Sequence, residues 1–194
     1  MGLLSGFSIL RNGVKMNYPF LESLRSALPL CDEFVLALGD SSDDTEAQVQ
    51  QLETEFPGKL RVIHNVWDTK NQSGGCQLKI QTDKALAECK GSWCLYLQAD
   101  EVFHEGDYPE IRKAIAAAAQ RPEVDGIVFD YLHFYGNYDY VISGRAWYRR
   151  EVRVIRNGRG IEAHRDAQGF RRGGKRLKAI ASGRPGISLR ARAK

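Results

Sequence analysis

Two acidic residues, Asp100 and Glu101, stand directly after a short apolar stretch of this sequence and could bind a metal ion or a polar substrate. Residues 93–101 read Trp-Cys-Leu-Tyr-Leu-Gln-Ala-Asp-Glu, a run of strand-forming residues that stops on the two carboxylates. Open α/β sheets bind their ligands at the carboxyl ends of strands. A core strand that leads into a polar turn would show the same local pattern, so the rest of the chain must decide between them.

A second polar loop, Asp-Ser-Ser-Asp-Asp-Thr at residues 40–45, follows another apolar stretch and precedes a helical pattern. The N-terminus of a helix attracts anions, and carboxylates placed there can instead accept hydrogen bonds from a base or a ribose. The same residue types are preferred as N-caps of any helix. This loop alone therefore leaves a ligand site and a plain capping loop open.

The elements that would position these residues alternate between strand and helix. Apolar stretches predict strands at 5–10, 33–38, 60–66 and 93–97. Apolar residues at helical spacing, such as Leu21, Leu24 and Leu28, predict helices between these strands. Short connections and this alternation indicate a parallel, doubly wound sheet.

The region after residue 101 has a different character. We predict a helix at 107–120 and strands at 125–133 and 148–156. Between the two strands, residues 135–140 read Tyr-Gly-Asn-Tyr-Asp-Tyr, which could form a hairpin loop or a platform for a substrate.

The composition is that of an ordinary soluble domain. The 194 residues are 43% hydrophobic and 27% charged, and no apolar run approaches the length of a membrane-spanning helix. Residues 1–11 lack the basic and long apolar regions of a signal peptide, so we expect a first strand there. The four cysteines form no Cys-x-x-Cys pair, which favours free thiols in a reducing cytosol.

The charge is unevenly distributed. Residues 171–194 carry nine Lys or Arg and no acid, which leaves 19 basic residues (28 minus 9) against 24 acidic residues in the rest. An acidic domain with a basic end could bind an anionic membrane surface or nucleic acid through that end. The basic segment has no apolar period and no interleaved aromatic residues, so we expect an irregular tail from 171 to 194.

Four features occur in a fixed order along residues 5–101. They are a strand that ends in Arg11 and Asn12, a strand that leads into the loop at 40–45, a helix that begins at a Gly-Gly pair, and Leu-Gln-Ala-Asp-Glu at 97–101. Their order and spacing resemble glycosyltransferase family 2, where the loop reads Asp-Asp-Gly-Ser-x-Asp-x-Thr and the later strand ends in Asp-x-Asp. Residues 125–170 look like a bacterial subgroup of the same family.

The resemblance implies a Rossmann-like GT-A domain, with a mostly parallel mixed sheet flanked by helices. It further implies transfer of a sugar from a nucleotide-diphosphate sugar to a saccharide or other hydroxyl acceptor. We expect the domain to span 1–170, with a nucleotide-binding half at 1–101 and an acceptor-side half at 102–170. A diphosphate leaving group calls for a divalent cation, Mn²⁺ or Mg²⁺, held by few carboxylates so that phosphate and water complete its shell.

The resemblance also assigns residues. Asp100 matches the last aspartate of Asp-x-Asp and becomes the expected metal ligand, while the nucleotide-sugar contacts fall on Arg11, Asn12, Asp40, Ser41, Asp43 and Gln98. Two positions depart from the family pattern. Gln98 replaces the first aspartate of Asp-x-Asp, and an amide is a weaker metal ligand than a carboxylate. Leu38 and Gly39 stand where the family has adjacent aspartates, so nucleoside contact by Asp40 is a hypothesis.

An inverting transferase also needs a general base near the acceptor hydroxyl. The resemblance places it beyond the metal motif, at Glu162 or Asp166, with Asp130 and Asp139 as competitors. Each of these acids is individually more typical of a solvated surface residue. The segment Trp147 to Arg150 could present a ring and cations to a sugar phosphate, or could be a strand edge.

Three functions remain open from the sequence. The first is a metal-assisted glycosyltransferase in the cytoplasm, with peripheral contact at the inner membrane surface and no specific nucleic acid. The second is a non-catalytic, C-terminally shortened module that binds nucleotide, or polyanions through its basic tail, because members of the subgroup continue further. The third is a nucleotidyltransferase, for which Arg11-Asn12-Gly13 is a poor phosphate loop.

Overall fold

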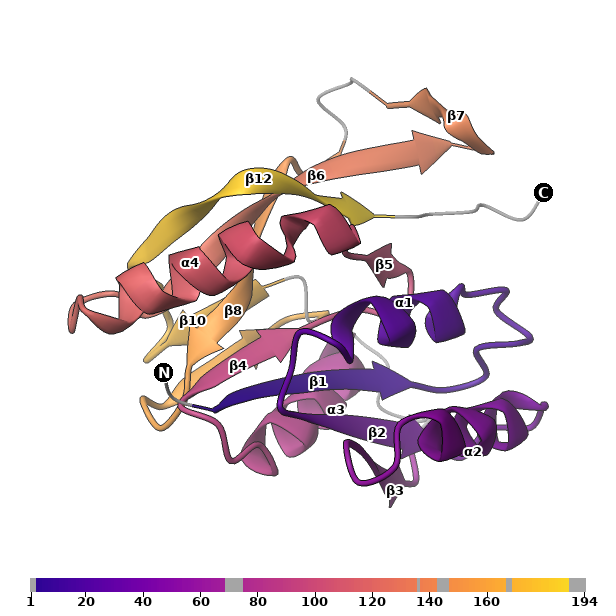
Figure 1. The fold of residues 1–194 in the computed structure, drawn as a ribbon. Coiled ribbons are helices and arrows are strands. Elements are labelled where there is room, and N and C mark those ends of the chain that lie inside the picture. Colours follow the sequence, from indigo (N-terminus) through magenta and orange to yellow (C-terminus); the bar gives the residue numbers. More distant parts are fainter. Residues whose placement is uncertain (1–2, 69–74, 136, 143–146, 167–168, 189–194) are drawn as a thin grey trace.

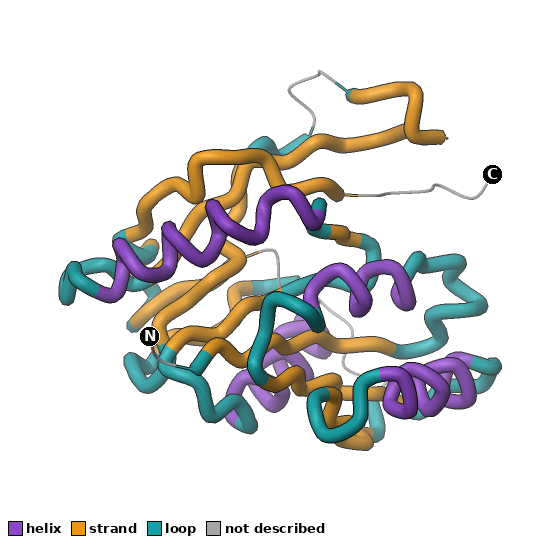
Figure 2. Tube along the Cα trace, viewed as in Figure 1, coloured by secondary structure: helices purple, strands orange, loops and turns teal. Residues whose placement is uncertain are grey.

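The N-terminal half is a regular alternation of strands and helices. The computed structural model describes residues 3–68, 75–135, 137–142, 147–166 and 169–188 (Figures 1 and 2). The elements up to the acidic motif are β1 (Leu4–Leu10), α1 (Phe20–Ala27), β2 (Glu33–Gly39), α2 (Thr45–Glu55), β3 (Leu60–Asn65), α3 (Cys76–Ala87) and β4 (Trp93–Tyr96). Their strands pair in parallel in the order β3-β2-β1-β4, which confirms the predicted doubly wound arrangement.

The second half adds antiparallel strands to the same sheet. Its elements are β5 (Glu101–Val102), the 3₁₀ helix η2 (Glu105–Asp107), α4 (Tyr108–Ala119), β6 (Gly126–Tyr135), β7 (Asn137–Val141), β8 (Arg150–Arg156), β9 (Ile161–His164), β10 (Gly169–Arg172), β11 (Lys175–Arg176) and β12 (Ala179–Ser188). The sheet continues β4-β8-β6-β12-β5, with β7 paired to β6 as a hairpin. Strands β9, β10 and β11 form a separate small sheet. The predicted α/β class with a mixed sheet is therefore confirmed.

Both faces of the large sheet are covered. On β2, Phe34, Leu36 and Leu38 pack into one core with residues of α1, α2 and α4, while Val35 and Ala37 pack into a second core. The second core is closed by α3 and by the small sheet. In Figure 1, α1 and α4 accordingly lie on the opposite side of the sheet from α3. This double burial explains why the parallel strands are apolar at consecutive positions.

The basic tail differs from the irregular segment that we expected. Residues 171–172, 175–176 and 179–188 form strands β10, β11 and β12, and residues 189–194 lie outside the described part. Strand β12 pairs in parallel with β6, with a register shift between Ala181 and Pro185. Backbone pairing with a buried neighbour, together with the packing of Ile180 against the core, replaces the apolar period that the sequence lacks.

Two further observations concern the helices and the thiols. Within the described residues, no helix has the length and apolar character needed to cross a bilayer. The four cysteines are free thiols, and Cys31, Cys89 and Cys94 are buried. Burial of the Cys31 side chain raises the pKa of its thiol, so this group stays protonated.

Candidate active site

A cavity of about 360 Å³ lies where β1 and β4 end at the same edge of the sheet. Its wall comes from the ends of the two strands, the loop after β1, the turn after β4, the segment after β3, helix α3 and the loop after β9. The lining residues are Ile9, Leu10, Arg11, Asn12, Met16, Tyr18, Trp67, Leu78, Tyr96, Gln98, Ala99, Asp100 and Asp166. The structure thus brings together five of the residues selected from the sequence: Arg11, Asn12, Gln98, Asp100 and Asp166.

The rim of the cavity is held by Asp40. Its carboxylate accepts hydrogen bonds from Arg11 Nε at 3.1 Å and from the Trp67 backbone N–H at 3.1 Å. These two donors, the Trp67 amide first, lower the pKa of Asp40 more than its slight burial raises it. The Arg11 guanidinium also lies 5.9 Å from the centre of the Trp67 ring. Asp40 therefore orients a cation and an aromatic ring that both line the cavity.

The rest of the 40–45 loop ties the end of β1 to the start of α2. Ser41 Oγ accepts a hydrogen bond from Asn12 N–H at 3.0 Å, and Asn12 Oδ1 accepts one from Ser42 N–H at 2.7 Å. Asn12 has φ of 51°, a left-handed conformation that asparagine tolerates. Asp43 accepts hydrogen bonds from the Lys15 N–H at 2.7 Å and from Thr45 N–H at 3.1 Å. Ser41 and Asp43 thus bind backbone groups of the loop after β1 and of Thr45, and neither residue lines the cavity.

The turn after β4 is built on a buried ion pair. Glu101 and Arg153 of β8 have side chains only 2% and 1% exposed. Arg153 donates from Nε to Glu101 Oε2 at 2.8 Å and from Nη2 to Oε1 at 2.6 Å. Glu101 Oε2 also accepts the backbone N–H of Gln98 at 3.2 Å. Glu101 is thus neither a solvated acid nor part of the cavity wall.

Arg153 remains charged in this buried position. Its guanidinium lies between the rings of Tyr96 and Tyr131, 5.5 and 5.4 Å from their centres. Burial lowers the pKa of Arg153, but the attraction of Glu101 and Tyr131 raises it further, so the net pKa is raised. The sequence analysis missed this residue. The available signal was an arginine inside the apolar run of residues 152–155, because a charge buried in such a strand requires an anionic partner.

The sequence of this chain matches a known protein family. The model of the family described as glycosyl transferase family 2 matches residues 12–176, which include the whole cavity wall except its first three residues. The chain belongs to this family. With the mixed sheet and its flanking helices, this match confirms the predicted GT-A class and leaves the nucleotidyltransferase alternative without support.

Solved structures of this class resemble the family 2 chain at low identity. They include residues 1–349 of TarS from S. aureus, at 18% identity and a TM-score of 0.49 over 76% of this chain and 38% of that chain. A second is mannosyltransferase PcManGT from Pyrobaculum calidifontis in complex with GDP-Man and Mn²⁺, at 18% identity and a TM-score of 0.46 over 65% of this chain and 34% of that chain. The chain thus spans less than two fifths of either structure. A search of curated proteins found no match.

The two candidates for the general base of this family 2 chain, Asp166 and Glu162, lie in different surroundings. Asp166 lines the cavity, and its backbone packs against Gly75, where a Cβ atom would come within 2.4 Å of Asp166 Cα. Glu162 is about half exposed and accepts a hydrogen bond from Lys79 Nζ at 2.7 Å, which lowers its pKa. A cation-bound carboxylate is a weaker proton acceptor. Among the described residues, Glu162 is also not part of the cavity wall.

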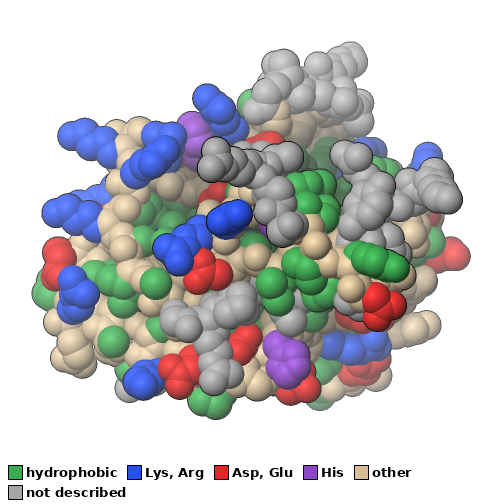
Figure 3. Space-filling model, turned by 90° about the horizontal axis from the view of Figure 1, so that it is seen from above, with side chains coloured by type: hydrophobic (Ala, Val, Ile, Leu, Met, Phe, Trp, Pro, Cys, Tyr) green, Lys and Arg blue, Asp and Glu red, His purple; other side chains and the backbone are tan. Residues whose placement is uncertain are grey.

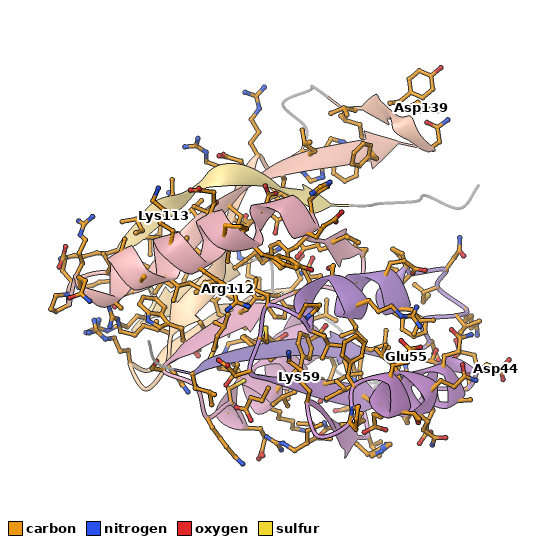
Figure 4. All side chains as sticks on the ribbon, in the orientation of Figure 1. Asp44, Glu55, Lys59, Arg112, Lys113 and Asp139 are labelled. Carbon is orange, nitrogen blue, oxygen red and sulfur yellow. The ribbon has the colours of Figure 1, made fainter. Side chains whose placement is uncertain are left out.

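The other residues considered from the sequence lie elsewhere. Asp130 pairs with Arg150 on the neighbouring strand, and Asp139 lies on the projecting β6–β7 hairpin (Figure 4). The rings of Trp147 and Tyr148 pack against His133, with centres 5.3 and 5.0 Å apart. They form an aromatic cluster with Tyr131, next to the buried ion pair.

One further acid, Glu151, was not selected from the sequence. It lies on β8 two residues before Arg153, beside the register shift that leaves Arg153 without a paired residue on β6. A Cβ atom on Gly169 would come within 2.9 Å of Glu151 Oε2, so the Glu151 carboxylate lies against the start of β10. Burial raises the pKa of Glu151, and the charges of Glu101 and Asp166 add to this effect against the opposing Arg153.

The cavity suits a divalent cation that shares its ligands with a substrate. Asp100 contributes a carboxylate and Gln98 an amide oxygen to the same wall. Within the described residues, no three His, Cys, Asp or Glu side chains are grouped to hold a metal by themselves. Mg²⁺ and Mn²⁺ are commonly bound through one or two carboxylates, with substrate phosphates and water as the other ligands. The donor set therefore fits such an ion.

Proposed function

We propose that this chain binds a nucleotide-diphosphate sugar in the cavity and transfers the sugar to an acceptor hydroxyl with the help of Mn²⁺ or Mg²⁺. The observation that carries the proposal is the convergence of Arg11, Asn12, Gln98, Asp100 and Asp166 on one cavity. They come from three separate parts of the chain and combine cationic, amide and carboxylate groups. This is the mixture that a sugar diphosphate with its counter-ion requires.

The residues divide between donor binding and ion binding. Arg11 and Asn12 bind the nucleoside and its phosphates, with the Trp67 ring as a flat wall for a base or sugar face. Asp100, assisted by the Gln98 amide, holds the divalent cation. When bound, the cation neutralises charge on the diphosphate leaving group. Asp40 keeps Arg11 in place through the hydrogen bond at 3.1 Å.

Asp166 serves as the general base in this proposal. The acceptor O–H gives its proton to the Asp166 carboxylate while its oxygen forms a bond to the anomeric carbon. The bond from that carbon to the diphosphate oxygen breaks, and its electron pair leaves with the nucleoside diphosphate. Asp166 is favoured over Glu162 because it lines the cavity, whereas Lys79 holds Glu162 outside it.

A ligand-binding panel tests donor binding. UDP, GDP and their sugar conjugates are titrated with and without Mn²⁺ by thermal shift and calorimetry. We expect Mn²⁺ to strengthen binding of one nucleotide and Asp100→Ala to abolish that gain. A matched control, Asp139→Ala, removes an acid from the projecting hairpin and should behave as wild type (Figure 4). The absence of any nucleotide-dependent shift in the wild type would refute the proposal.

Sugar transfer is tested separately with the nucleotide that binds. Release of nucleoside diphosphate from its sugar conjugate, with simple saccharides as acceptors, should fall about 100-fold or more in Asp166→Asn. Nucleotide binding in this variant should stay close to wild type. Glu162→Gln should keep most of the activity, and the reverse ranking would move the base to Glu162.

A binding-only role is the second candidate, supported by the basic β10–β11 hairpin. Arg172, Lys175 and Arg176 are exposed there, and Lys and Arg side chains gather on one side of the face in Figure 3. Removing residues 171–194 would also remove β12, so Lys175→Ala with Arg176→Ala is the better test. Salt-sensitive binding to anionic vesicles that this double variant loses, without sugar transfer by the wild type, would favour this role.

A further inference from the structure

The turn that presents Gln98 and Asp100 to the cavity is fixed from behind. The backbone N–H of Glu101 donates to the Gln98 carbonyl at 3.0 Å, and Ser23 Oγ of α1 donates to the same carbonyl at 2.9 Å. The Gln98 N–H donates in turn to Glu101 Oε2 at 3.2 Å. Both backbone polar groups of Gln98 are therefore bound, and Glu101 makes two of these three contacts.

Glu101 is itself held by groups that leave it little freedom. Arg153 binds both carboxylate oxygens, at 2.6 and 2.8 Å, and the Tyr131 hydroxyl donates to Oε1 at 3.1 Å. A bidentate guanidinium–carboxylate pair fixes direction as well as distance. With both side chains at most 2% exposed, water does not compete for these bonds. The orientation of the turn thus depends on a residue of β8, more than 50 positions away.

We propose that Glu101 and Arg153 are positioning residues that hold the 98–100 turn in its ion-binding shape. They couple the acceptor-side strand β8 to the metal-dependent part of donor binding, and this inference rests on the proposed function. A purely structural need would be met as well by an apolar pair, because buried ion pairs seldom exceed well-packed apolar replacements in stability. What the pair adds is a fixed acceptor for the Gln98 N–H and a fixed direction for Asp100.

The first experiment replaces the whole pair. In Glu101→Leu/Arg153→Met no buried charge is left alone, so the fold is expected to be retained. Calorimetry with UDP and GDP, with and without Mn²⁺, measures the Mn²⁺-dependent gain in nucleotide affinity. We expect this gain to fall about tenfold or more, as when outer partners of metal ligands are removed. Affinity without Mn²⁺ should change little, which a general loss of structure would not produce.

The matched control applies the same substitutions to an exposed pair. Arg25 and Glu55 join α1 to α2 with a contact of 2.6 Å, and both side chains are more than 40% exposed. Figure 4 labels Glu55 on α2. Glu55→Leu/Arg25→Met should leave the Mn²⁺-dependent gain unchanged. A finer variant, Tyr131→Phe, removes only the hydroxyl that binds Glu101 and should lower the gain by a smaller factor, about two- to fivefold.

Each outcome decides the inference. A folded Glu101→Leu/Arg153→Met variant whose Mn²⁺-dependent gain stays within about twofold of wild type would overturn it. Should that variant fail to fold, Tyr131→Phe decides, and an unchanged gain there also overturns it. Failure of the proposed function gives a different result, because the wild type itself would then gain nothing from Mn²⁺ with either nucleotide, and the inference would fall with it.

Discussion

Two arginine–carboxylate pairs flank the same cavity and differ in almost every physical respect. Arg11 and Asp40 meet at the rim with side chains 26% and 44% exposed, whereas Arg153 and Glu101 are sealed behind the turn at 1% and 2%. An exposed pair contributes at most about 1 kcal/mol and is weakened by salt. The buried pair cannot exchange partners. The rim pair is therefore suited to meet a ligand, and the buried pair to hold the groups that do.

The largest expected effect comes from breaking only one side of the buried pair. Arg153→Met leaves Glu101 as an isolated buried carboxylate, so the free energy of unfolding should fall by about 3–5 kcal/mol. Urea denaturation at pH 7 measures this loss. The double replacement with Glu101→Leu should recover most of it. Equal losses in the single and double variants would show that packing, and not the lone charge, governs this site.

An intermediate effect is expected at the rim. Arg11→Ala should lower the free energy of unfolding by less than about 1 kcal/mol, because the Arg11–Asp40 pair is exposed. The affinity for the nucleotide that binds should fall about tenfold, since a charged donor to the ligand is lost. Calorimetry at two salt concentrations checks this: the wild-type advantage should shrink as salt rises. A large stability loss with unchanged affinity would reverse the roles that we assign to the two pairs.

The smallest effect concerns Glu151, which lies on β8 two residues before Arg153. Burial raises the pKa of Glu151, so the folded state holds its proton more tightly than the unfolded state does. Ionisation at neutral pH therefore costs stability, and the cost disappears as the pH falls through the folded pKa towards about 4.3, the unfolded value. Glu151→Gln should raise the melting temperature at pH 7 and leave it unchanged near pH 4. A lower melting temperature at pH 7 would contradict the assignment.

The comparison also shows what the sequence could predict. The rim residues Arg11, Asn12 and Asp40 stand directly after buried parallel strands, and strand ends of a parallel sheet meet at one edge, so their neighbourhood follows from local pattern. The partner of Glu101 cannot be predicted from local pattern, because β8 pairs antiparallel with β4 from a distant part of the chain. An arginine at an inward strand position signals that some buried anion exists, but many acids precede it in the chain.

Two features of the C-terminal part have the same physical origin. Glu162 and Asp166 are separated by three residues, yet the contact of Asp166 with Gly75 and of Glu162 with Lys79 sends them to different environments. The basic segment lacks an apolar period, yet its residues 179–188 pair with β6 as strand β12. Contacts with distant parts of the chain determine both the surroundings of these acids and the structure of the basic segment. Such contacts cannot be predicted from the local order of residue types.

The pairing of β12 has a consequence for how the protein is made. Its Ile187 and Ser188 stand opposite Val102 and Glu101, so the strand that directly follows the acidic turn obtains its neighbour only from the far end of the described chain. On a ribosome, which releases the chain from the N-terminus onward, the parallel half can form early. The strand after the Asp100 turn can pair with its neighbour only after residues 179–188 have emerged. A nascent chain would therefore form the parallel sheet before it completes the candidate active site.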